Sequence, residues 1–83
     1  MVKGFLKEIS EEKRYGILKY RGREILVKFW ESEGELVGAF FLPEKTTSDG
    51  ILFSAEIYRA VGKKENVDGI IEDLEEHIES ILK

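Results

Sequence analysis

Aromatic and basic side chains are interleaved in the first 30 residues of this 83-residue chain. Aromatic rings stack on nucleobases and Lys or Arg side chains pair with phosphates, so this mixture is typical of surfaces that bind single-stranded nucleic acid. The candidate ligand-binding residues are Lys13, Arg14, Tyr15, Arg21, Arg23, Lys28 and Trp30. Whether they act together depends on the strand faces that they occupy.

Patterns that indicate catalysis or metal binding are weak. His77 is the only histidine, and its neighbours Asp73, Glu76 and Ser80 are those that any acidic helix would place near it. The chain has no cysteine, which excludes disulfides and thiolate metal sites, and its scattered glycines form no phosphate-binding loop. We therefore expect a protein that is not an enzyme and has no catalytic residues, cofactor or metal.

Charge divides the chain into two parts. Residues 1–30 contain eight Lys and Arg against four Glu, a balance of plus 4, whereas residues 31–83 contain five against thirteen acidic residues, a balance of minus 8. The basic part could bind an anionic partner. A basic sheet neutralised by the chain's own acidic helix would show the same division.

Composition predicts one small globular domain spanning residues 1–83. Hydrophobic residues make up 42% of the chain, and no apolar run approaches the roughly 18 residues of a membrane helix. The N-terminus lacks the apolar stretch of a signal peptide, so we expect a soluble, cytoplasmic protein with no membrane partner. Abundant Lys and Glu, with one Asn and no Gln, are typical of thermophilic proteins.

Strand patterns occupy residues 3–61. The predicted strands are 3–9, 14–20, 23–30, 36–42 and 51–61. A tight turn at Arg21-Gly22 joins the second and third strands, and a second hairpin turn is expected at 31–35. Pro43 is expected to end the fourth strand, and 44–50 to form a polar loop.

Alternation assigns the faces of these strands. In the third strand Ile25, Val27 and Phe29 share the predicted core face, and Glu24, Leu26, Lys28 and Trp30 lie on the other face. The fourth, "LVGAFFL", is apolar on both faces and is expected to be covered on both. In the fifth we expect Ile51, Phe53, Ala55 and Ile57 to point inward.

A helical period begins at Val67 and predicts an amphipathic helix over about 67–82. Its apolar stripe consists of Val67, Ile70, Ile71, Leu74, Ile78, Ile81 and Leu82, and Asn66 or Asp68 is expected to cap its start. This helix needs an apolar surface to cover. Ile17, Leu26 and Trp30 could supply it, with the acidic flanks of the helix pairing with nearby Lys and Arg, and this arrangement is favoured over a free ligand surface.

Two runs resemble the first three strands of a cold-shock domain: "GFLKEISEEKRYGIL" at 4–18 and "GREILVKF" at 22–29. The resemblance implies a five-stranded oligonucleotide/oligosaccharide-binding barrel that stacks single-stranded bases on aromatic rings. Tyr15 keeps a ring at one of that family's stacking positions. Glu8, Ile17, Leu26 and Lys28 stand at four other binding positions, so the resemblance supports a barrel more than base stacking.

The expected fold class is α+β: a five-stranded antiparallel sheet, curled into a small barrel or half-barrel, followed by one C-terminal amphipathic helix. The expected function is a small non-enzymatic binding protein, with single-stranded nucleic acid as its ligand on a basic and aromatic sheet face. The alternative is a protein interaction or homodimerisation module, which associates through an open strand edge, the helix or the "LVGAFFL" strand.

Overall fold

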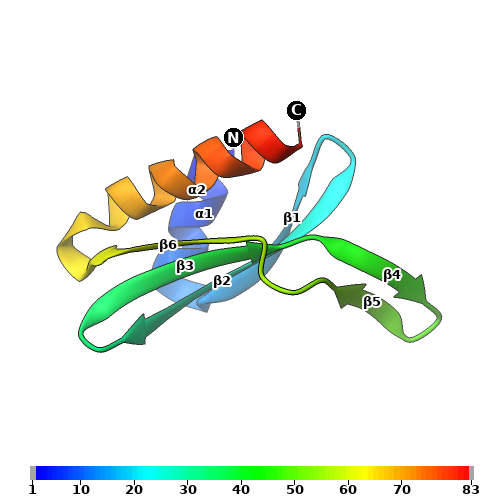
Figure 1. Ribbon diagram of the computed structural model, residues 1–83, viewed down its shortest axis with the longest axis horizontal. Coiled ribbons are helices and arrows are strands. Elements are labelled where there is room, and N and C mark those ends of the chain that lie inside the picture. Colours follow the sequence, from blue (N-terminus) through cyan, green and yellow to red (C-terminus); the bar gives the residue numbers. More distant parts are fainter. Residues whose placement is uncertain (1, 83) are drawn as a thin grey trace.

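The chain folds into a layer of helices on one face of an antiparallel sheet. The computed structural model describes residues 2–82, with the side chains of all of these except residues 2, 3, 12 and 13. Helices α1 (Val2–Glu8) and α2 (Val67–Ile81) lie on the same side of the sheet (Figure 1). The sheet has the order β1-β2-β3-β6, with β1 Tyr15–Tyr20, β2 Arg23–Ser32, β3 Glu35–Phe41 and β6 Tyr58–Lys63.

The remaining strands form an arm that projects beyond this sheet (Figure 1). Strands β4 (Pro43–Thr47) and β5 (Gly50–Phe53) pair only with each other in the described residues. A π-helical turn, Ile9–Lys13, connects α1 to β1, and a 3₁₀ turn, Lys64–Asn66, leads into α2. The arm contributes to the elongated shape, with extents of 39 × 25 × 20 Å.

The α+β class and the C-terminal helix are confirmed, but the five-stranded barrel is not. Within the residues that the structure describes, no pairing joins β1 to β6, and the sheet of four strands remains open. The sheet lacks two segments that the barrel required: the predicted first strand is helical, and the first part of the predicted fifth strand pairs within the arm.

The predicted strand at 3–9 is wrong, because this segment is helix α1 and the beginning of the π-helical turn. Leu6 and Ile9 are 0% and 1% exposed and belong to the core under the helices. Their spacing of three residues places both on one side of a helix, whereas alternation would have placed them on opposite faces of a strand. Packing of these two side chains therefore selects the helix.

The predictions for residues 43–61 are also corrected. The strand before Pro43 ends as predicted, since β3 stops at Phe41, but Pro43 also begins β4, and most of the predicted loop at 44–50 is the rest of β4. The predicted strand at 51–61 is interrupted at 54–57, where the Ser54 amide donates to the Leu42 carbonyl oxygen (2.8 Å). Of the four residues predicted to point inward, Ile51 and Phe53 are half-buried, and Ala55 and Ile57 are exposed.

The two predicted hairpin turns are confirmed. Arg21 and Gly22 have φ values of 52° and 80°, and Glu33 and Gly34 have values of 52° and 82°. Positive φ at both central residues is the geometry of a type I′ turn, whose twist matches that of the flanking strands. The turns therefore fix the register of β1 with β2 and of β2 with β3.

The predicted core face of β2 is confirmed and carries the helix layer. Ile25, Val27 and Phe29 are almost fully buried together with Leu74 and Ile78 of α2. At Gly38, on the same face of β3, a Cβ atom would lie 2.7 Å from the Phe29 ring and 2.8 Å from the Leu74 side chain. The helix therefore packs directly on this face of the sheet.

The prediction that α2 covers Ile17, Leu26 and Trp30 is wrong. These side chains alternate with the core residues and lie on the opposite face of the sheet. The physical reason is that the face with Ile25, Val27 and Phe29 offers a continuous apolar surface, and both helices bury it.

Candidate functional site

The sheet surface opposite the helices, here called the open face, is the candidate site. Strand register arranges its side chains in three rows that cross the sheet. The rows are Ile17, Leu26 and Phe41; Tyr15, Lys28, Ala39 and Arg59; and Trp30, Val37 and Val61. Charged register partners, Lys19 with Glu24 and Glu35 with Lys63, lie at its two ends. The open face thus has a largely apolar centre and a charged rim.

Exposure on the open face rises from its centre to its edge strands. Val37 and Ala39 of β3 are 3% and 0% exposed, although no second layer covers them, because longer side chains on β2 and β6 flank them. The expectation that "LVGAFFL" is covered on both faces holds only for the helix side, because on the open face neighbouring side chains bury these two residues and no second layer lies over them. In contrast, Tyr15, Ile17 and Val61 are 65%, 49% and 50% exposed.

Two cations lie against aromatic rings on the open face. The Lys28 Nζ atom is 5.7 Å from the centre of the Phe41 ring, and the Arg59 guanidinium is 5.4 Å from that of Trp30. Such placements allow a cation–π attraction, and the aliphatic stems cover apolar surface while the charged ends reach water. These side chains can shift without breaking the core.

The charges of the open face are largely matched within it. Arg59 donates two hydrogen bonds to Glu56, of 2.7 and 2.9 Å, and this pairing raises the pKa of Arg59. Lys28, by contrast, makes no ion pair with any residue that the structure describes. With Glu24 and Glu35 as register partners of Lys19 and Lys63, the face is close to neutral in formal charge, and Lys28 is the cation near its centre that has no acidic register partner.

The structure brings together three of the seven predicted site residues. Tyr15 and Lys28 are direct partners across β1 and β2, and Trp30 lies two residues further along β2 on the same face. The side chain of Lys13 lies outside the described residues. Arg23 precedes Ile25 by two residues in β2, so it shares the face of Ile25 and belongs to the helix side of the sheet.

The remaining two arginines also lie away from the open face. Arg14 is 3.4 Å from Glu31, which also pairs with Lys64 at 3.1 Å, and these two cations lower the pKa of Glu31. Arg21 occupies the β1–β2 turn, with its guanidinium 5.5 Å from the centre of the Tyr20 ring. The predicted basic rim is therefore distributed over both sides of the molecule.

Sequence reasoning missed three members of the open face: Phe41, Arg59 and Val61. The sequence does contain a signal for them. A strand that is apolar on both faces, as β3 is, needs a neighbouring strand on each side whose side chains shield it from water. The sequence prediction makes residues 58–61 the end of one long strand, 51–61, and so leaves the pairing of β6 with β3 unassigned.

His77 takes part in a structural contact between α2 and β6. Its ring stacks on Tyr58, with ring centres 3.7 Å apart, and its Nδ1 donates to the Asp73 carbonyl oxygen (2.9 Å). The Tyr58 hydroxyl donates to the Asp73 carboxylate (2.8 Å), and this bond raises the pKa of Tyr58. These contacts hold α2 against the edge strand β6.

Comparison of the chain with protein-family models, curated proteins and solved structures finds no match in any of the three. The likeness of residues 4–29 to a cold-shock domain therefore stays a prediction. Among the described residues, no helix is long and apolar enough to cross a membrane, and no group of three or more potential ligands could hold a metal ion.

Proposed function

We propose that this protein is a non-enzymatic interaction module that self-associates through its open face. The observation that carries the proposal is that both helices lie on one side of the sheet, leaving two apolar rows uncovered on the other. Large exposed apolar patches on small domains mark interaction surfaces. Ile17 and Val61, on the two edge strands, are exposed members of this patch, and Val37 and Ala39 of the "LVGAFFL" strand lie buried between the edge strands.

The size of the open face fits an interface between two copies. Four strands about 4.8 Å apart, rising about 3.3 Å per residue over six to ten residues, span about 400 to 600 Å² in projection. Protruding side chains increase the accessible area. A standard interface takes about 800 Å² from each partner, which is of the same order.

The charge distribution favours a second copy as the partner. In a twofold dimer the same patch meets itself, so a strongly charged face would repel its own copy. This face is close to neutral. The acidic side chains of α2 belong to the opposite layer and are Glu72, Asp73, Glu75, Glu76 and Glu79. Two copies joined through their open faces would therefore keep their acidic helices far apart.

Single-stranded nucleic acid is the second candidate, and one arrangement favours it. Tyr15, Lys28 and Phe41 lie on three adjacent strands, so an exposed ring, a cation and a second ring follow one another across the sheet. This is the kind of platform on which bases stack beside a phosphate. With Arg59 already paired to Glu56, however, the face offers phosphates little uncompensated positive charge.

Sedimentation equilibrium over a wide concentration range tests self-association. Val61→Lys places a charge in an apolar row of the proposed interface, on a side chain of the edge strand β6 that is 50% exposed, and should shift the protein to monomer without unfolding it. Ile81→Lys is the matched control, because Ile81 is 46% exposed but lies on α2. A wild-type protein that stays monomeric at all concentrations, or equal effects of both variants, would contradict the proposal.

Trp30 fluorescence separates the two candidates, because this is the only Trp. Dilution of a dimer held together by the open face should expose Trp30 to water and shift its emission to longer wavelength. Titration with single-stranded oligonucleotides at low salt should leave the emission unchanged if protein is the partner. Quenching that saturates and weakens as salt rises would instead establish nucleic-acid binding.

A further inference from the structure

A groove lies in the helix layer, where neither helix covers the end of β1. Helix α1 packs near the start of β1 and α2 packs over β3 and β6, so the inner side of the β1–β2 hairpin end is left uncovered. The groove has a volume of about 540 Å³, within the range of roughly 300 to 1,000 Å³ that is usual for small-molecule sites. Its lining residues are Phe5, Ile17, Leu18, Lys19, Tyr20, Arg21, Glu75 and Glu79.

The floor of the groove is apolar and aromatic. Leu18 is buried, and Phe5 and Tyr20 are partly buried and pack against the core. These side chains come from α1 and β1, two elements fixed by the hydrophobic core. The floor is therefore preformed, and an apolar ligand could bind there without ordering a new segment.

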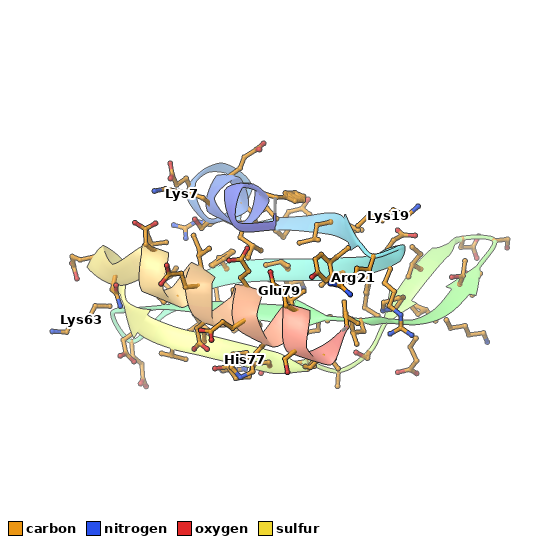
Figure 2. All side chains as sticks on the ribbon, turned by 90° about the horizontal axis from the view of Figure 1, so that it is seen from above. Lys7, Lys19, Arg21, Lys63, His77 and Glu79 are labelled. Carbon is orange, nitrogen blue, oxygen red and sulfur yellow. The ribbon has the colours of Figure 1, made fainter. Side chains whose placement is uncertain are left out.

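The walls of the groove carry unpaired charges of opposite sign. Glu75 and Glu79 come from α2 one helical turn apart, and Arg21 comes from the β1–β2 turn. Seen from the helix side, Glu79 lies on the flank of α2 that faces Arg21, whereas His77 lies on the other flank (Figure 2). None of the three makes an ion pair with a side chain that the structure describes.

Repulsion between the Glu75 and Glu79 carboxylates destabilises the ligand-free protein. Like charges four residues apart on a helix repel one another, and a cation between them would relieve this repulsion. Arg21 is held over the Tyr20 ring, at 5.5 Å, where its guanidinium is available to a carboxylate in the groove. The walls therefore complement a molecule with a cationic end toward α2 and an anionic end toward the turn.

We infer that this groove binds a small apolar zwitterion, of the size of an apolar amino acid or a dipeptide. The ammonium group lies between Glu75 and Glu79, the carboxylate accepts from Arg21, and the apolar side chain rests on Phe5, Leu18 and Tyr20. Ile17 and Lys19 of the edge strand β1 border both the groove and the open face. The groups that hold the ligand lie on the helix side, so the inference does not rest on self-association.

Titration of ¹⁵N-labelled protein with L-phenylalanine tests the inference. Amide resonances of Leu18 and Tyr20 should shift and approach saturation, and those of β3 should not. Phenethylamine lacks the carboxylate and 3-phenylpropionate lacks the ammonium group. Each should bind about threefold to fivefold more weakly than L-phenylalanine, the size expected for losing one exposed ion pair. The dipeptide of phenylalanine shows whether the groove prefers the longer zwitterion.

Charge-neutralising variants assign each end of the ligand. Glu79→Gln should weaken L-phenylalanine and phenethylamine but not 3-phenylpropionate, and Arg21→Ala should weaken L-phenylalanine and 3-phenylpropionate but not phenethylamine. Glu76→Gln and Arg23→Ala are matched controls, since neither residue lines the groove. Shifts that never approach saturation, equal binding of all three probes, or equal effects of variants and controls would overturn the inference.

Discussion

Gly38 is the residue at which β3 and α2 approach most closely. Gly38→Ala would place a Cβ atom within 2.7 Å of the Phe29 ring and 2.8 Å of the Leu74 side chain, so one of these buried groups must move. Overpacking of this kind costs about 1 to 3 kcal/mol. We expect the free energy of unfolding in urea to fall by that amount.

Gly4→Ala is the matched control for this substitution. Gly4 lies in α1, and a Cβ atom there would meet nothing within 4 Å. Replacing glycine by alanine inside a helix stabilises it by up to about 1 kcal/mol. The two alanine variants should therefore change stability in opposite directions. Equal stabilisation by both would contradict the close packing of α2 on the sheet.

Tyr58 makes stability depend on pH in the alkaline range. Its bond to the Asp73 carboxylate favours the neutral phenol and raises the Tyr58 pKa above its ordinary value of about 10. The stabilisation is therefore fully present below the ordinary pKa and is lost as pH rises through the raised one.

The ultraviolet titration of tyrosinate measures this effect, because subtracting the curve of Tyr58→Phe from that of the wild type isolates Tyr58. We expect Asp73→Asn to lower the pKa of Tyr58 toward its ordinary value. A Tyr58 curve unchanged by Asp73→Asn would contradict the assigned cause.

Local signals account for the elements that could be predicted. Arg21-Gly22 and Glu33-Gly34 fix two hairpins, and alternation in β2 then separates Ile25 from Trp30. The same alternation correctly placed Lys28 with Trp30, so the centre of the open face could be read from the sequence. Each of these features depends on residues close together in the chain.

The misassigned elements depend on contacts between distant residues. The segment around Leu6 carries apolar residues that suit a strand or a helix, and only its contact with the distant core decides between them. Contacts between α2 and residues of β2, which lie more than 40 positions earlier in the chain, likewise decide which face of the sheet the helix covers. Arg21 and Glu79 line the same groove only because of this packing, so the site could not be predicted from local sequence patterns.

The β4–β5 arm is the element that should open most readily. Isolated two-stranded hairpins are at best marginally stable in water, and every residue of β4 is exposed. Ser54 fastens the base of the arm, because its hydroxyl oxygen accepts from the Leu42 amide (3.3 Å) and the hydroxyl donates to the Ala55 carbonyl oxygen (2.7 Å).

Ser54→Ala should therefore speed amide exchange in β4 and β5 severalfold while lowering global stability by no more than about 1.5 kcal/mol. Ser48→Ala, at the exposed tip of the arm, is the control and should leave exchange at the base unchanged. Equal exchange rates in β4 and β2 would show that the arm does not open independently.

At the scale of the whole molecule, salt should act on self-association in a direction opposite to its effect on nucleic-acid binding. Each copy carries a net charge of −4, so two copies repel one another over long distances. Their proposed interface is close to neutral and gains its stability from apolar burial, which moderate salt does not weaken. Because added salt screens the repulsion, with a screening length falling from about 10 Å at 0.1 M to about 3 Å at 1 M, the dimer should become tighter.

Sedimentation equilibrium at low and high sodium chloride measures this dependence directly. We expect the dissociation constant to fall or stay constant as salt rises, and Val61→Lys to remain monomeric in both conditions. Binding through phosphates would release counterions and weaken steeply over the same range. A dimer that dissociates as salt rises would therefore contradict an apolar interface and indicate one held together by ion pairs.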